Sequence, residues 1–327
     1  MTAAGDDLRP GSVEAVELLG ALREWAAELG LERLAVASPD RRPEATLLDE
    51  WLARGDHAGM GYLARRRELR LDPDRFLPGV RSIVCAAWAY DRAGAMEAPR
   101  PGATSGGALR IARFAWGRDY HVELRRRLRA LVARLRARLP ALKARVAVDT
   151  APVLERHWAA QAGLGWIGRH GCLIVPGLGS WVFLGEIFLD LPLPAGAPLA
   201  AACGECRRCL EACPGGALRE GRPMDARRCV SYWTVEHSGA FPRRGVPKLS
   251  PWLFGCDACQ EACPWNAGGA GSREPVAPGL ADALHWTAED WERLGAEGFA
   301  GRCSETPLAR AGYANILRNA RRIAGRE

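Results

Sequence analysis

Eight of the eleven cysteines lie between residues 203 and 263, at a spacing that suits iron-sulfur chemistry. The first run reads Cys203-x2-Cys206-x2-Cys209-x3-Cys213-Pro214, and the second reads Cys256-x2-Cys259-x3-Cys263-Pro264, with a lone Cys229 between them. In runs of this type, three cysteines bind one 4Fe-4S cube and the fourth, directly before proline, binds the other cube. The pattern therefore predicts two 4Fe-4S clusters.

The second run lacks its leading cysteine, because Leu253 stands at that position. Another thiolate must complete the set, and Cys229 is the nearest candidate in the sequence. Two structural zinc sites, each held by four cysteines, are the alternative use of the same CxxC pairs. For the clusters we assign one ligand set to Cys203, Cys206, Cys209 and Cys263, and the other to Cys213, Cys229, Cys256 and Cys259.

The remaining cysteines, Cys85, Cys172 and Cys303, have no CxxC partner, so we expect them to pack as small apolar residues. Residues 1–10 are acidic and lack the apolar core of a signal peptide. We therefore expect a cytoplasmic protein with reduced thiols rather than a disulfide framework.

Length and composition predict a globular protein with one large domain and a smaller one. The chain has 327 residues, of which 48% are hydrophobic and 25% charged. No apolar run reaches the length of a membrane span, so we expect no membrane insertion. The net charge of +7 suits a polyanionic partner, although many basic proteins have none.

Hydrophobic periodicity predicts an alternation of helices and short strands. The expected helices are 13–30, 47–70, 120–139, 151–162 and 306–322, and the expected strands are 34–37, 82–89, 144–148, 172–175 and 181–188. The arginines of 120–139 are interpreted as a solvated face. Ala, Gly and Pro make 91–107 a predicted loop, and the stretch from Pro264 to residue 305 is expected to be irregular. The N-terminal part should thus be an α/β, or α+β, layer structure.

A linker rich in Pro, Ala and Gly at 192–198 marks the predicted domain boundary. We expect a first domain at 1–195, a cysteine-rich domain at 196–275 and a tail with one closing helix at 276–327.

The stretch 149–187 is dense in glycine and thinly charged, and the strand 144–148 should deliver Asp149 to its end. Its glycines would let the backbone approach a large flat ligand, but tight turns explain them equally well. Gly163, Gly165 and Gly168 spell G-x-G-x-x-G, yet a predicted helix precedes them where a dinucleotide site requires a strand. We therefore do not assign such a site.

This stretch, the cysteine spacing, the segment GCDACQEACPWN at 255–266 and the tail Leu317-Arg318-Asn319-Ala320 together resemble epoxyqueuosine reductases. The resemblance covers nearly the whole chain. It implies an α/β (α+β) cobalamin-binding N-terminal domain followed by a ferredoxin-like domain with two 4Fe-4S clusters. Such an enzyme reduces epoxyqueuosine at the tRNA wobble position to queuosine, in the last step of queuosine biosynthesis. We expect the short form, without a C-terminal HEAT-like extension.

The resemblance makes Asp149 the catalytic acid that protonates the departing oxygen, and it matches all eight cysteines to cluster ligands. A free aspartate has a pKa of about 3.9, so it would need a raised pKa to act as an acid. His157 and His170, with an ordinary histidine pKa of about 6.5, are alternative acids. The expected cobalamin contacts are Arg70, Arg113, Asp149, Leu173, Leu184 and Ser231.

The expected partners are a tRNA carrying epoxyqueuosine and an external reductant such as a flavodoxin or ferredoxin system, with the enzyme acting as a monomer. Basic segments at 65–67, at 243–244 with Lys248, and at 318–322 are candidates for tRNA contact. Two other functions use similar parts: a cobalamin-dependent reductive dehalogenase, and a non-catalytic iron-sulfur electron carrier. The lack of a twin-arginine export segment speaks against the dehalogenase.

Overall fold

The computed structural model describes residue 9 and residues 11–91, 107–267 and 275–326. The predicted loop at 91–107 lies, for residues 92–106, outside the described residues. The chain forms two compact units, each assembled from three separate stretches. The first unit contains Met1–Glu50, Tyr62–Ala89 and His121–Glu205, and the second contains Trp51–Gly61, Tyr90–Tyr120 and Cys206–Glu327. The domain boundaries expected from the sequence stay a prediction.

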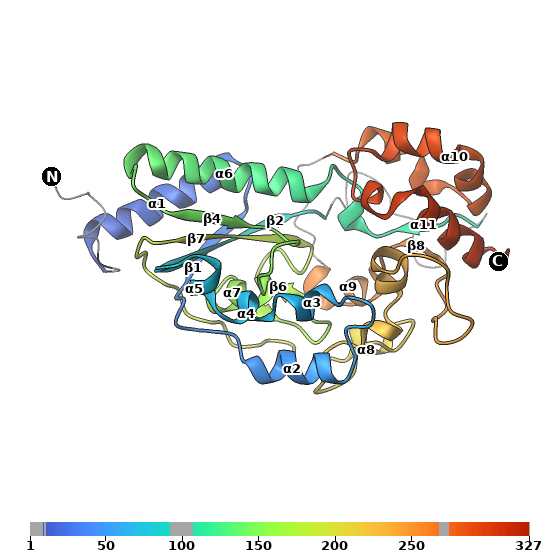
Figure 1. The fold of residues 1–327 in the computed structure, drawn as a ribbon, viewed down its shortest axis with the longest axis horizontal. Helices are drawn as coiled ribbons and strands as arrows, with labels where there is room; N and C mark the ends of the chain where they lie inside the picture. Colours follow the sequence, from blue (N-terminus) through green and yellow to red (C-terminus); the bar gives the residue numbers. More distant parts are fainter. Residues whose placement is uncertain (1–8, 10, 92–106, 268–274, 327) are drawn as a thin grey trace. The chain divides into compact units, whose positions relative to one another are not determined.

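The first unit is built on a four-stranded antiparallel sheet in the order β1-β2-β7-β4 (Figure 1). Its strands are β1 (Arg33–Ala37), β2 (Ser82–Ala89), β7 (Val182–Leu189) and β4 (Ala144–Ala147). Every residue of β2 is buried, which explains its almost continuous apolar sequence, because both faces of the sheet are covered.

Two long helices, α1 (Val13–Glu28) and α6 (Tyr120–Arg138), cover one face of this sheet (Figure 1). Helix α6 buries a stripe of four leucines, whereas its arginines at 126, 129, 136 and 138 are exposed. Gly185 of β7 permits close packing, since a Cβ there would collide with Leu124 and Leu128. The expected helix at 120–139 is thus confirmed.

Short helices cover the other face: α4 (Arg67–Leu71), α5 (Pro73–Phe76) and α7 (Glu155–Gln161) (Figure 1). Helix α7 packs against β1, β2 and β7, and Phe76 of α5 contacts Phe188 of β7 with ring centroids 4.6 Å apart. Two short strands, β5 (Trp166–Ile167) and β6 (Leu173–Ile174), pair antiparallel beside α7.

The continuous helix expected at 47–70 is wrong. The chain instead forms α2 (Ala45–Ala53), α3 (Tyr62–Arg65) and α4, separated by turns. Gly55 has a φ of 66° and Ala58 a φ of 52°, conformations that no α-helix contains. The glycine-rich sequence of residues 55–61 favours such turns over helix.

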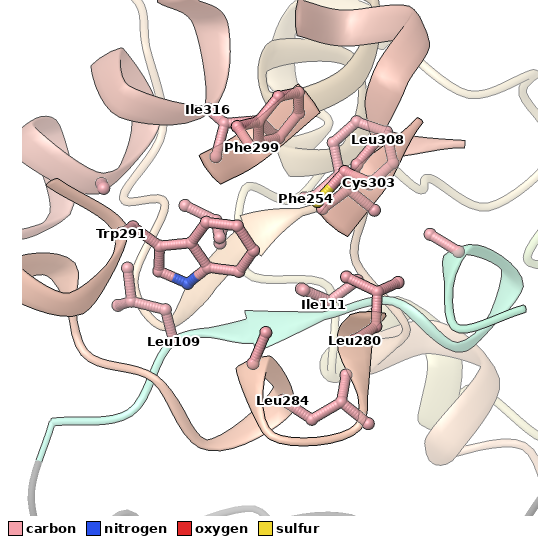
Figure 2. Packing of buried hydrophobic residues seen from close by; sticks show 14 of the residues in the cluster. Leu109, Ile111, Phe254, Leu280, Leu284, Trp291, Phe299, Cys303, Leu308 and Ile316 are labelled. Carbon is pink, nitrogen blue, oxygen red and sulfur yellow. The ribbon is translucent and has the colours of Figure 1, made fainter. Parts of the chain in front are cut away.

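The second unit has a hydrophobic core of its own, formed largely by the C-terminal residues (Figure 2). Strands β3 (Arg110–Ile111) and β8 (Trp252–Phe254) pair in parallel, and α10 (Ala288–Cys303) and α11 (Leu308–Ile323) pack on each other. The other short helices are η1 (Arg113–Ala115), α8 (Arg208–Glu211), η2 (Ala226–Arg228), the π-helix η3 (Tyr232–Glu236), α9 (Ala258–Glu261), η4 (Pro264–Asn266), η5 (Pro278–Leu280) and η6 (Ala283–His285).

Helix α10 corrects the expectation that 265–305 is irregular, whereas the closing helix expected at 306–322 is confirmed as α11. The start of α10 carries a capping box, in which Thr287 and Asp290 exchange hydrogen bonds with each other's backbone. Gly295 interrupts the helix with a φ of 71°, which obscures its periodicity in the sequence. Among residues 11–91, 107–267 and 275–326, no helix has the length and apolar character needed to cross a membrane.

Candidate functional site

Asp149 lies in a tight bend just beyond the end of β4. The strand ends at Ala147, Val148 is fully buried, and Asp149 then takes a φ of 44°. A positive φ is uncommon for a residue other than glycine, although Asp and Asn tolerate it better than most. The side chain of Asp149 is 47% exposed, so it can reach a ligand.

Two helices on opposite faces of the sheet hold this bend. His121, in the first turn of α6, places its Nε2 atom 2.5 Å from Oδ2 of Asp149. Glu155, the first residue of α7, accepts the backbone N–H of Asp149 through Oε1. Both the carboxylate and the backbone of Asp149 therefore have fixed partners.

Two further carboxyl groups lie behind Asp149. Loss of hydration, and then the charge of Asp149, raise the pKa of Glu155 to about 8, although the Asp149 N–H, Arg156 and His121 act in the opposite direction. Glu186 of β7 is 0% exposed, and neither of its oxygens has a hydrogen-bond partner among the described residues. Burial and the nearby Glu155 raise the pKa of Glu186 well above its ordinary value. Glu155 is therefore mostly an uncharged acid near neutral pH, and burial shifts Glu186 in the same direction.

His157 and His170, the alternative acids, are held by the backbone. His157 donates from Nε2 to the carbonyl of Arg41 over 2.7 Å, and burial lowers its pKa. His170 accepts the Cys172 N–H at Nδ1, and burial, with the charge of Arg156, lowers its pKa to about 4. Both histidines are thus neutral at pH 7 and make poor proton donors there.

Sequence reasoning missed His121 as a partner of Asp149. These residues are 28 positions apart, on a helix and after a strand, and only the packing of α6 on the sheet joins them. No local sequence pattern indicates a contact between residues so far apart in the chain. The available signal was a histidine that continues the apolar stripe of an otherwise arginine-rich helix.

Arg70, an expected cobalamin contact, lies near the Asp149 bend. It is 7% exposed, and its Nε atom has no hydrogen-bond partner within the described residues. Burial lowers its pKa, while the charge of Glu155 opposes that change, so the two side chains are within electrostatic range. A buried N–H without a partner costs free energy, and an acceptor such as a cofactor amide would remove that cost.

The other expected contacts are divided between the units. Leu173 is buried in β6 and Leu184 is partly exposed on β7, both in the first unit. In the second unit, Arg113 forms an ion pair with Asp91 at 2.7 Å, and Ser231 lies partly exposed directly before η3.

Most glycines of 149–187 are explained by the chain itself. A Cβ at Gly163 would collide with the carbonyl of Ala197, and one at Gly165 with the carbonyl of Ile174. Gly177 and Gly179 have φ values of 79° and 69°, as tight turns require. Of the two interpretations left open by the sequence, turns and close packing therefore account for these positions.

The two cysteine runs share one local design, in which a short helix carries the middle of each run. Helix α8 contains Cys209 and is followed by Cys213, and helix α9 contains Cys259 and is followed by Cys263. The two helices contact each other. None of the eight cysteines forms a disulfide, and each is buried or partly buried.

The thiols of the second expected ligand set lie near one another. Burial raises the pKa of Cys256 to about 12, and the charges of Asp257, Cys229 and Cys213 add to this effect. Burial likewise raises the pKa of Cys229, with a contribution from Cys213. In the part of the chain that the structure describes, no three His, Cys, Asp or Glu side chains converge closely enough to hold a single metal ion.

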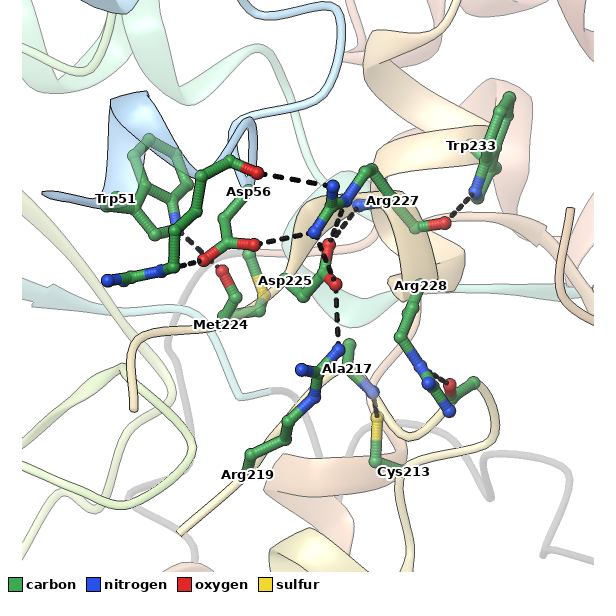
Figure 3. A network of polar contacts seen from close by, with 12 residues as sticks. Trp51, Asp56, Cys213, Ala217, Arg219, Met224, Asp225, Arg227, Arg228 and Trp233 are labelled. Carbon is green, nitrogen blue, oxygen red and sulfur yellow. Dashed lines mark hydrogen bonds and ion pairs between the residues drawn. The ribbon is translucent and has the colours of Figure 1, made fainter. Parts of the chain in front are cut away.

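A polar network fixes the turn that precedes Cys229 (Figure 3). Asp225 is buried and accepts hydrogen bonds from Arg227 and Arg219 at 2.8 Å, and Arg227 also bonds Asp56 at 2.7 Å. The hydrogen bond from Arg227, and then its charge, lower the pKa of Asp225. The turn that presents Cys229 is thereby anchored to the distant stretch 51–61.

Comparisons with known proteins identify two regions. The profile of the 4Fe-4S double cluster binding domain matches residues 202–266, which contain all eight clustered cysteines. The profile of epoxyqueuosine reductase QueG, DUF1730, matches residues 70–150, which end one residue past Asp149. The expected double-cluster domain is confirmed.

Solved structures extend the similarity. An epoxyqueuosine reductase bound to an epoxyqueuosine-modified tRNA-Tyr stem loop matches 95% of this chain and 82% of its own, with a TM-score of 0.79 and 26% identity. The Bacillus subtilis epoxyqueuosine reductase, solved with the loop of a catalytic aspartate swung out of the active site, matches the same shares with a TM-score of 0.80 and 26% identity. A catabolic reductive dehalogenase reaches only 0.49 at 16% identity and supports neither that activity nor a cofactor.

Sequence similarity is also high over most of the chain. The epoxyqueuosine reductase of Xanthomonas campestris pv. campestris is 39% identical over 298 residues, which cover 91% of this chain and 84% of that enzyme. The chain therefore belongs to the epoxyqueuosine reductase family of oxidoreductases.

Proposed function

We propose that this protein reduces epoxyqueuosine at the wobble position of tRNA to queuosine. The observation that carries the proposal is an accessible Asp149, fixed at the end of β4 by His121 and Glu155, in a chain that is 39% identical to an epoxyqueuosine reductase. A relative of the same fold, solved with a modified tRNA stem loop, supports the choice of substrate.

The proposed cofactors are cobalamin and two 4Fe-4S clusters. Cobalamin, when bound, supplies electrons to the epoxide. Its contacts in this chain are Arg70, Arg113, Asp149, Leu173, Leu184 and Ser231, and the buried Nε of Arg70 offers the clearest vacant donor. The clusters take the two sets of four cysteines assigned from the sequence, and an external flavodoxin or ferredoxin system supplies the electrons. The protein acts as a monomer in the cytoplasm.

Asp149 is the proposed proton donor. Breaking the carbon–oxygen bonds of an epoxide leaves negative charge on oxygen, which an acid at that atom neutralises. The carboxyl of Asp149 is partly exposed and can meet the substrate, while His121 keeps it at one position. A wobble base inside a stacked loop must be flipped out before an enzyme can act on it, so the substrate reaches Asp149 as an extruded nucleotide.

For the tRNA backbone, we propose contacts with Arg243, Arg244 and Lys248, which are all exposed. In the other basic segments, Arg67 and Arg318 have partners within the protein. Arg67 pairs with Asp49, and Arg318 donates to the carbonyls of His237, Gly239 and Trp233. Phosphate contact is therefore assigned to the segment 243–248.

The proposal is tested with protein reconstituted anaerobically with iron, sulfide and cobalamin, supplied with a strong reductant and a tRNA that carries epoxyqueuosine. Nucleoside mass spectrometry should show conversion to queuosine. Iron-loaded protein that binds no cobalamin and converts nothing would favour the electron carrier. Release of halide from a small organohalide, with no change in the tRNA, would favour the dehalogenase.

A further inference from the structure

Reduction of an epoxide to an alkene, with the oxygen leaving as water, consumes two electrons and two protons. One aspartic acid holds a single proton, so Asp149 must be reloaded during each turnover. The question of what reloads it arises only if the proposed function holds.

We propose that His121, Asp149 and Glu155 act as one acid unit, in which His121 returns a proton to Asp149 and Glu155 holds the Asp149 backbone as an uncharged carboxylic acid. Asp149 alone touches the substrate. His121 and Glu155 are positioning residues that act through it.

The contact between His121 and Asp149 suits direct proton transfer. Nε2 of His121 and Oδ2 of Asp149 are 2.5 Å apart, so they are in direct hydrogen-bond contact with no water between them. The ring of His121 is buried, so solvent does not compete for this nitrogen. Histidine is also the side chain whose ordinary pKa lies closest to neutral pH.

The proton steps balance. The O–H bond of Asp149 breaks as an O–H bond forms on the departing oxygen, which leaves Asp149 as a carboxylate. The Nε2–H of His121 then breaks and the proton moves to Oδ2, which readies Asp149 for the second donation, to hydroxide. The two electrons come from the external reductant, and the exposed side of Asp149 admits replacement protons from solvent.

In this scheme Glu155 is an uncharged carboxylic acid that accepts the Asp149 N–H through Oε1. Besides Asp149, groups on five elements interact electrostatically with Glu155: His121 of α6, Arg156 of α7, Glu186 of β7, Cys85 of β2 and Arg70 of α4. Three of them are cationic or can become so, and they favour an ionised Glu155. Loss of hydration and the charge of Asp149 are the larger effects and keep the proton on Glu155.

The first test compares His121→Gln with His285→Gln, an exposed histidine of η6. Glutamine can hydrogen-bond Asp149 but cannot donate a proton near neutral pH. In cluster- and cobalamin-loaded protein, His121→Gln should lower kcat by about 100-fold and flatten the pH profile near neutral pH, with KM for tRNA unchanged, since general acid groups contribute roughly 100-fold or more. The control should match wild type. Wild-type kcat and pH profile in His121→Gln would overturn the proposal.

The second test concerns the charge on Glu155. Glu155→Gln keeps a neutral acceptor for the Asp149 N–H, whereas Glu155→Ala removes it. The alanine variant should lose at least tenfold more kcat than the glutamine variant. Equal losses would mean that Glu155 works as an anion, and the proposal would be wrong in that part.

A third measurement does not depend on turnover. Histidine titration by NMR in the full-length, cluster-loaded protein should show that Asp149→Asn lowers the pKa of His121 and leaves His285 unaffected, because a nearby carboxylate favours the imidazolium. If the titration of His121 does not respond, the pair is not coupled. Failure of the wild type to convert the tRNA, with coupling intact, would instead count against the proposed function.

Discussion

At the scale of single residues, the role proposed for Asp149 depends on an uncommon backbone conformation. A φ of 44° outside glycine carries a small steric cost, which the surrounding contacts must offset. Asparagine accepts this conformation as readily as aspartate does. Substitution of Asp149 by asparagine therefore removes the carboxyl group and keeps the shape of the side chain.

Asp149→Asn should keep the fold, the clusters and cobalamin binding, and should lower turnover of epoxyqueuosine tRNA by roughly 100-fold or more, the usual contribution of general acid catalysis. Single-turnover kinetics and bound-cobalamin spectra give the two readouts. Asp40→Asn, at an exposed position, is the matched control. Near-normal turnover in Asp149→Asn would remove it from the role of proton donor.

Glu186 makes stability depend on pH. Its pKa is raised above the ordinary 4.5 in the folded protein, so the native state keeps a proton that the unfolded chain releases. This contribution is complete below pH 4.5 and is lost as pH rises toward the folded-state pKa, at about 1.4 kcal/mol per pH unit for one group. The free energy of unfolding should therefore fall as pH rises above 4.5.

Thermal unfolding of Glu186→Gln should show a shallower decline over that range than wild type. Glu17→Gln, on the exposed side of α1, should leave the decline unchanged. Parallel curves for Glu186→Gln and wild type would show that Glu186 is already ionised in the folded protein.

At the scale of elements, the sequence predicted the helices and strands that have long periodic or continuous apolar patterns. Helix α6 and strands β2 and β7 were all placed from their apolar residues. Helix α10 was missed because Gly295 breaks its periodicity, and the helix expected at 47–70 failed because glycine turns divide it. The cysteine sets and Asp149 could be named from spacing and resemblance, whereas His121 required the packing of α6 against the sheet.

Because the second cysteine run lacks its leading cysteine, we expect Cys229 to be required for one of the two clusters. Cys229→Ala should abolish one cluster and leave the other, so bound iron should fall from about eight to about four atoms per chain after anaerobic purification. Iron analysis and electron paramagnetic resonance measure this.

Cys303→Ala is the informative control, because Cys303 is a further cysteine in the second unit that lies outside the two runs. Its side chain is buried in the core of the second unit, with Phe299 and Leu308 (Figure 2). The control should keep both clusters. Full iron content in Cys229→Ala would show that another thiol completes the set, and two zinc ions with no iron would replace the cluster assignment altogether.

At the scale of the whole molecule, a net charge of +7 predicts binding to tRNA that weakens as salt rises. The variant with alanine at 243, 244 and 248 should bind more weakly and lose about two units from the slope of log affinity against log salt, since each phosphate contact contributes about 0.7 to 0.9. The variant with alanine at 129, 136 and 138 removes equal charge from the exposed face of α6. It should bind like wild type, and equal losses in both variants would mean that charge acts without a defined surface.

Asn319 lies in the tail segment 317–320, and through it helix α11 can influence metal content without providing a metal ligand. Its buried amide donates to the carbonyls of Thr234, five residues after Cys229, and of Leu253, three residues before Cys256. Leu253 is itself 0% exposed in the hydrophobic core of the second unit, so a cysteine placed there would lie among apolar side chains. Helix α11 thus fixes the segments that carry Cys229 and Cys256 relative to each other. A chain that ends before residue 317 should therefore lose the cluster bound by Cys213, Cys229, Cys256 and Cys259, although it keeps every cysteine.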